Sequence, residues 1–128
     1  MPATDDANLR TIETVIEAFN QHDIDAILEH FTDDCVWVMA SGPAPTGRRC
    51  VGKDEIRSVL AERFQIIPNM RWVDCTNWVN GDRAVSEWTV KGTAGSGERL
   101  DWLGCDLWEF RAGLIAKKDT YWKRIDHG

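Results

Sequence analysis

The sequence has no long apolar run, no basic excess and no closely spaced cysteine pair, and each absence excludes a class of protein. No segment approaches the roughly 20 apolar residues of a membrane-spanning helix, so we expect no membrane association. The 15 basic and 21 acidic residues give a net charge of −6, which disfavours nucleic acid as a partner. No cysteine or histidine has zinc-like spacing, so we expect no metal and no cofactor.

The first ten residues also lack the pattern of a secretory signal. They are polar and acidic, with Asp5 and Asp6 near the start, whereas a signal peptide needs an apolar core. We therefore expect a cytoplasmic protein. In a reducing compartment its four cysteines would be small buried or half-buried thiols rather than disulfides.

The order of predicted elements is that of a single α+β domain. Residues 1–6 are expected to form a disordered tail, and one domain should span residues 7–126. Helical spacing of apolar residues predicts helices over 7–22, over 24–31 after an Asp23 cap, and from Gly52 to Pro68. A β-type run covers 35–39, and the Gly- and Pro-rich segment 41–47 must be a loop.

The second half of the chain is predicted to be an antiparallel meander. Strands are expected near residues 69–79, 83–93, 99–110 and 114–124, and Asn80-Gly81-Asp82 is a strong hairpin signal. Helices followed by long strands are typical of an α+β fold with the helices packed on one face of a sheet.

Several segments in this order resemble the SnoaL-like branch of the nuclear transport factor 2-like superfamily, over about residues 8–125. They are 19–25 (FNQHDID), 31–34 (FTDD), 51–56 (VGKDEI), 81–88 (GDRAVSEW), 106–110 (DLWEF) and 117–123 (KKDTYWK). The resemblance implies a cone-shaped fold, in which a curved, mostly antiparallel sheet wraps around three N-terminal helices and a pocket opens at one end. Relatives include ketosteroid isomerase, polyketide cyclases, an epoxide hydrolase and non-catalytic binding proteins, so the fold alone does not give the function.

Strand alternation assigns one face of each strand to the implied cavity. The predicted ligand-binding residues on that face are Trp37, Met39, Trp88, Trp102, Trp108, Thr120 and Trp122. Several tryptophans around one cavity would suit a flat or cyclic apolar ligand. The alternative is that they are core fillers and half-exposed strand residues, an interpretation that fits Trp72 and Trp78 best.

Asp106 and Lys118 are the candidate catalytic residues. Asp106 lies between apolar neighbours on a predicted central strand, where a carboxylate must be hydrogen-bonded, paired or protonated. The resemblance implies a role like that of the isomerase aspartic acid, which donates a hydrogen bond to an oxyanion; a general acid or base and a purely structural salt bridge stay open. Lys118 either faces inward and pairs with Asp106 or reaches solvent, and the rarity of buried lysine favours solvent.

The known catalytic sets of the family are not preserved. The isomerase base and tyrosine correspond to Met39 and Val15, and the epoxide hydrolase positions carry residues that cannot activate water. Polyketide cyclases have an acid near position 120, where this chain has Thr120, with Asp119 predicted to point to the other face. The sequence therefore leaves open whether the protein is an enzyme.

The opposite face of the strand 99–110 presents Leu103, Cys105 and Leu107, an apolar stripe that predicts a homodimer through the convex face of the sheet. The function expected is binding of a small apolar, cyclic molecule, with proton-transfer chemistry of the isomerase, cyclase or dehydratase type. The alternatives are a non-catalytic carrier or sensor, and a structural dimerisation module whose cavity is filled by its own side chains.

Overall fold

The computed structural model describes residues 2–125 and contains three helices and six strands. The helices are α1 (Pro2–Asn20), α2 (Ile24–Leu28) and α3 (Lys53–Ile66). The strands are β1 (Phe31–Val38), β2 (Arg49–Val51), β3 (Arg71–Asn80), β4 (Arg83–Thr93), β5 (Arg99–Arg111) and β6 (Leu114–Trp122). This is the α+β architecture that the sequence predicts.

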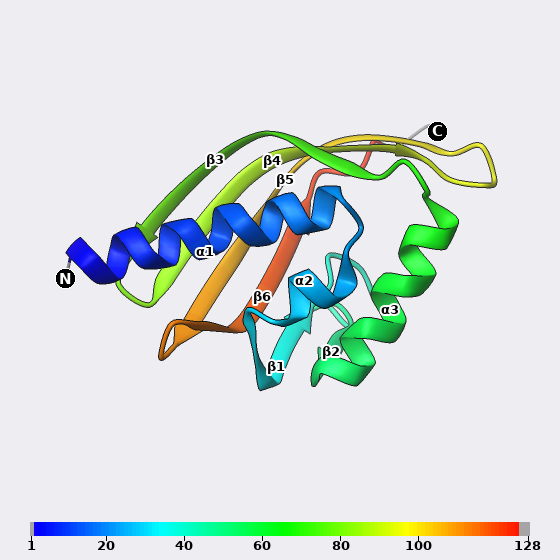
Figure 1. The fold of residues 1–128 in the computed structure, drawn as a ribbon. Helices are drawn as coiled ribbons and strands as arrows, with labels where there is room; N and C mark the ends of the chain where they lie inside the picture. The colour runs from blue at the N-terminus through cyan, green and yellow to red at the C-terminus, as the bar shows by residue number, and fades with distance from the viewer. Residues whose placement is uncertain (1, 126–128) are drawn as a thin grey trace.

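All six strands form one sheet in the order β2-β1-β6-β5-β4-β3. The pairs along the meander β3-β4-β5-β6 are antiparallel, and β1 joins β6 in parallel. Figure 1 shows the sheet arching over α1, while α3 lies towards the other end of the sheet. α1 packs against β3, and α3 packs against β1 and α2, so the helices cover one face and leave the convex face open.

Two predicted helix boundaries need correction. α1 begins at Pro2 rather than Ala7, so residues 2–6 are helical instead of a disordered tail, and the Asp5 side chain accepts a hydrogen bond from the Gly81 amide. α2 ends at Leu28, although the predicted helix ran on to Phe31. Phe31 instead begins β1 and pairs with Ile115 of β6, because sheet pairing overrides the local helical spacing.

The short strand β2 is absent from the sequence-based prediction. It pairs with β1 across the loop of residues 39–48. Gly47 makes this loop possible: its φ is 83°, and an added Cβ would lie 2.0 Å from the Met39 carbonyl oxygen. A three-residue strand carries too little periodicity to be recognised without its partner.

The core lies between the helices and the concave face of the sheet. Buried apolar side chains of α1, α2 and α3 meet those of β1, β5 and β6 in one cluster, which includes Ile12, Leu28, Leu60, Trp108 and Ile115. A second cluster, around Met70, Trp88, Val90, Leu100 and Trp102, lies between β4 and β5 and the chain that follows α3. No helix in the described part of the chain is long and apolar enough to cross a membrane.

Candidate functional site

The sheet register agrees with the face assignment made from the sequence. On β5, Trp102, Asp106 and Trp108 are buried, while Leu103 and Leu107 are exposed. On β6, Lys118 and Thr120 are buried, and Asp119 lies on the opposite face. Trp37 of β1 and Trp88 of β4 are also buried. The predicted site residues on these four strands therefore share the concave interior.

Asp106, Lys118 and Thr120 form a hydrogen-bonded network in the middle of that interior. Lys118 Nζ lies 3.1 Å from Asp106 Oδ1, and each side chain exposes 6% or less of its surface. Thr120 donates its hydroxyl to Asp106 Oδ1 at 2.7 Å and accepts from Lys118 Nζ at 2.8 Å. The register places Thr120 directly opposite Asp106 on neighbouring strands, so strand pairing itself brings these groups together.

Lys118 corrects the expectation of a solvent-facing lysine. Its ammonium group lies 4.6 Å from the centre of the Trp37 ring and 5.2 Å from that of Phe19, a cation–π arrangement. Burial lowers the pKa of Lys118 from its usual value of 10.5, and the nearby Asp106 carboxylate opposes that effect. The aromatic rings and the carboxylate together compensate the ammonium for its lost water.

The interior tryptophans hold the polar network in place through their indole nitrogens. Trp88 Nε1 donates to Asp106 Oδ2 at 3.0 Å, and Trp37 Nε1 donates to Thr120 Oγ1 at 3.0 Å. Asp106 thus has protein donors on both oxygens. Such a network stabilises one arrangement of the core and also orients the carboxylate.

The interior around this network is almost completely filled. One void of about 10 Å³ is bounded by Asp106, Lys118, Trp72 and Trp88. A second, also of about 10 Å³, is bounded by Thr120, Lys118, Arg63 and Trp122. Each has room for one water molecule at most, so the Trp-lined cavity expected from the sequence is closed in this conformation.

An open groove of about 360 Å³ lies next to the second void, at the end of the molecule formed by α3, the β4–β5 turn and the end of β6. We call it the end groove. Its lining includes Arg63, Ile67, Met70, Leu100, Trp102 and Trp122, together with Glu98 and Arg124. Arg63 and Trp122 border both the end groove and the void beside Thr120, so these two side chains separate the groove from the interior.

Arg63 is a site residue that the sequence-based reasoning missed. Its guanidinium carbon lies 5.4 Å from the centre of the Trp37 ring and 5.5 Å from that of Trp122. The signal was available, because Arg63 follows Ile56 by seven residues and Leu60 by three, on the buried face of α3.

Trp72, Trp78 and Met39 lie outside the polar network. Trp72 is half-buried and borders both inner voids, with its ring edge-on to Phe19 at 5.2 Å and to Trp88 at 6.5 Å. Trp78 is 52% exposed on β3, which agrees with the half-exposed strand position expected for it. Met39 lies just past β1, where its sulfur accepts a hydrogen bond from Cys50 Sγ at 3.9 Å.

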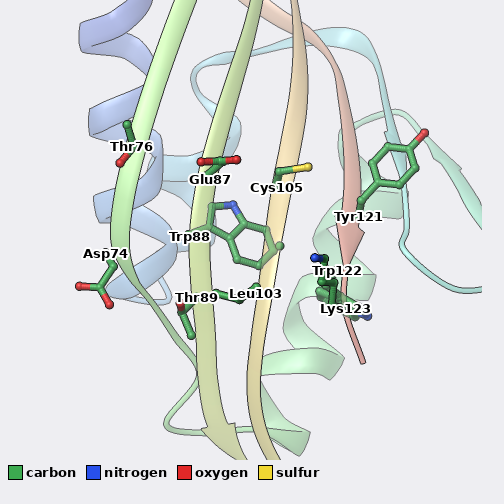
Figure 2. Close-up of a pocket in the computed structure, with 11 residues that line it drawn as sticks. Asp74, Thr76, Glu87, Trp88, Thr89, Leu103, Cys105, Tyr121, Trp122 and Lys123 are labelled. Carbon is green, nitrogen blue, oxygen red and sulfur yellow. The ribbon is translucent and has the colours of Figure 1, made fainter. Parts of the chain in front are cut away.

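A hollow of about 580 Å³, larger than the end groove, lies on the convex face of the sheet rather than at the polar network. Figure 2 shows its lining, with Leu103 and Cys105 on β5 and Tyr121 on β6. We call it the outer hollow. Gly104 also lines it, and the absence of a side chain makes room for the Trp88 ring, because a Cβ there would lie 2.6 Å from that ring. Leu103 and Tyr121 beside it are 60% and 54% exposed.

The geometry supports acid–base chemistry better than metal or thiol chemistry. Residues 2–125 contain no cluster of three or more side chains suited to holding a metal ion. Burial raises the pKa of Cys35 and Cys50, which disfavours the reactive thiolate. A carboxylate and an amine in hydrogen-bond contact, shielded from water, can exchange protons with a molecule that reaches them.

Comparisons with known proteins agree on the fold. The model of the SnoaL-like domain family matches residues 12–118. A candidate polyketide cyclase from Xanthomonas campestris has a TM-score of 0.85 at 21% identity, covering 94% of this chain and 93% of that one. TerC, co-crystallised with polyporic acid, has a TM-score of 0.80 at 24% identity, with 91% and 92% covered. A comparison with curated proteins gives no match.

Proposed function

Because the chain belongs to the SnoaL-like domain family, we propose that it binds a small, apolar, cyclic organic molecule and catalyses a proton transfer on it. The observation that carries the proposal is the Asp106–Lys118 pair, buried at the inner end of an aromatic path that leads to the end groove. TerC offers a parallel for ligand binding in this fold.

The proposed path runs through Arg63 and Trp122. Both side chains border the end groove and the void beside Thr120, and Lys118 borders both inner voids. Movement of Arg63 and Trp122 would join the groove to the interior. Within residues 2–125 no salt bridge holds Arg63 in place, and Trp122 is half-buried near the end of the last strand.

In the proposed reaction Asp106 is the base. Its carboxylate removes a proton from a carbon next to a carbonyl group, and the Lys118 ammonium donates a hydrogen bond to the enolate oxygen that forms. In a β,γ-unsaturated carbonyl compound that enolate is a dienolate, and return of the proton to its γ-carbon shifts the double bond and completes an isomerisation with no other reactant. The Lys118 ammonium lies 3.1 Å from Asp106 Oδ1, so Lys118 is assigned as the donor to the oxyanion and Asp106 as the base, in place of the oxyanion donor that the resemblance implies.

Exchange of hydrogen for deuterium in 2-tetralone tests this proposal without knowledge of the natural substrate. We expect the protein to accelerate exchange of the α-protons in D₂O, measured by NMR. Asp106→Asn should reduce the acceleration at least about 100-fold, the scale of a lost general base. Asp119→Asn, on the outer face of the neighbouring strand, is the matched control and should retain it.

The double variant Asp106→Asn/Lys118→Met removes the base without leaving an unpaired buried charge, and it should be equally inactive. Circular dichroism establishes that each variant is folded. Acceleration that persists in folded Asp106→Asn would exclude Asp106 as the base.

A non-catalytic carrier is the second candidate, and the closed interior favours it. Both oxygens of Asp106 are occupied by protein donors, and the voids beside it hold one water molecule at most. A carrier would bind ring compounds in the end groove, detected by tryptophan fluorescence, with no exchange of 2-tetralone protons in the wild-type protein.

We also propose a homodimer through the convex face. Leu103, Leu107 and Tyr121 are exposed there around the outer hollow, which a second copy would cover. Light scattering should give twice the mass of the chain at micromolar concentration. Leu103→Asp should reduce it to the monomer mass without unfolding, because Leu103 is 60% exposed. A wild-type monomer would refute this proposal.

A further inference from the structure

The positive charges in the lining of the end groove outnumber the negative ones. Arg124 Nη2 forms a salt bridge with Glu98 Oε2 at 3.3 Å, so these two charges compensate each other. Arg63 is the remaining charged residue of the lining. Within the described residues no carboxylate forms a salt bridge with it. The groove therefore carries one uncompensated positive charge, in a chain whose net charge is −6.

Arg63 is positioned for a ligand rather than for the protein surface. Its guanidinium lies over the rings of both Trp37 and Trp122, and desolvation by burial lowers its pKa. A desolvated cation without an anion is unfavourable. A planar guanidinium can bind a carboxylate or enolate through two hydrogen bonds. An anion in the groove would therefore give Arg63 the negatively charged partner that the described residues do not provide.

Trp102 adds an independent observation. The indole nitrogens of Trp37, Trp88 and Trp108 each donate to a named oxygen. The indole nitrogen of Trp102 is buried and has no acceptor among the described residues, although the ring lines the end groove. A buried donor without an acceptor is costly, and an oxygen on the ligand can satisfy it.

We infer that the end groove selects a monoanionic ring compound, in which the rings contact Trp102 and Trp122 and a carboxylate, enolate or phenolate oxygen binds Arg63. The two indole rings lie 5.4 Å apart at an interplanar angle of 56°, and both line the groove. At about 360 Å³ the groove is at the small end for ligand sites. A cationic ligand would be repelled by Arg63. This inference rests on the proposed function, because it names the ligand class of the same site.

Calorimetric titration with 2-naphthoate and 2-naphthamide tests the inference. The two probes share a ring system and differ in charge. We expect 2-naphthoate to bind the wild-type protein at least about tenfold more tightly than the amide at low salt. Arg63→Met should remove that preference while leaving the affinity for the amide within about twofold. Arg63→Lys, which keeps the charge, should retain part of it.

The matched control is Arg57→Met, on the exposed face of the same helix, where Arg57 pairs with Asp25. It should leave the preference unchanged. Trp102→Phe should weaken the binding of 2-naphthoate several-fold more than that of 2-naphthamide, because phenylalanine keeps an aromatic ring but lacks the indole N–H donor. Equal binding of both probes to the wild type would overturn the inference and leave the proposed binding function standing. Binding of neither probe would overturn both.

Discussion

The interior network and the end groove contain the same kinds of residue, a cation among tryptophans. In the interior the polar groups have partners within the protein, whereas in the end groove a cation and an indole nitrogen lack them among the described residues. In the interior, Lys118 has a carboxylate at 3.1 Å, and Trp37 and Trp88 donate to nearby oxygens. In the end groove, Arg63 has no carboxylate partner among the described residues, and Trp102 Nε1 has no acceptor. Polar groups satisfied within the protein stabilise it, whereas unsatisfied ones are available to a ligand.

This contrast separates residues that maintain the fold from residues that select a ligand. Substitutions in the interior should change stability strongly, because they leave a buried charge without its partner. Substitutions in the end groove should change binding and leave stability nearly unaltered. The following predictions test that division, beginning with the largest effect.

Lys118→Met should destabilise the protein most. It leaves Asp106 buried without its cation, and breaking a buried ion pair in this way costs about 3–5 kcal/mol. Asp106→Asn/Lys118→Met should recover more than half of that loss, because no charge stays buried and an oxygen remains for Trp88. Urea denaturation gives the free energy of unfolding of both variants. Lys117→Met, at the half-exposed neighbouring position, is the control and should cost less than about 1 kcal/mol. A double variant no more stable than Lys118→Met would contradict the assignment.

Raising the pH should increase the stability of the wild type relative to the same double variant. The pKa of Lys118 is lower in the folded protein than its usual 10.5. Between these two pKa values the unfolded chain binds a proton that the folded protein does not, so the free energy of unfolding rises with pH. This pH range lies below 10.5. We would therefore measure the free energy of unfolding of both proteins by urea denaturation from pH 7.5 to 10. If the stability of the wild type relative to the double variant fell with pH, the Asp106 carboxylate would raise the pKa of Lys118 by more than burial lowers it.

Arg63→Met should have the smallest effect on stability, within about 1 kcal/mol of the wild type. Methionine keeps the apolar contact with Trp37 and Trp122, and it removes a charge that has no acidic partner. Thermal denaturation at neutral pH is a sufficient measurement. A loss as large as that of Lys118→Met would place Arg63 with the structural residues and weaken the contrast between the two regions.

Much of the fold followed from local sequence patterns. The strand bounds of the meander, the Asn80-Gly81-Asp82 hairpin and the inward positions of Trp102, Asp106 and Trp108 agree with the structure, because alternation along a strand fixes which side chains share a face. Trp37, Trp88, Thr120 and Trp122 also border the interior or the end groove. Their roles in binding stay predictions.

Only the tertiary structure showed which partners these strand faces pack against. Local spacing assigned Phe31 to a helix, but pairing with Ile115 placed it in β1. The rarity of buried lysine favoured a solvent-facing Lys118, and only the convergence of Asp106, Thr120 and two aromatic rings explains its burial.

The sequence by itself determined the α+β class, the order of the helices and of the strands other than β2, and the inward set on the longer strands, because these depend on residues close together along the chain. The three-dimensional packing determined that the expected cavity is filled, that Arg63 joins the site and that the open space lies at its end. Those features depend on how side chains from α1, α3 and five strands fit together, which cannot be derived from local sequence patterns.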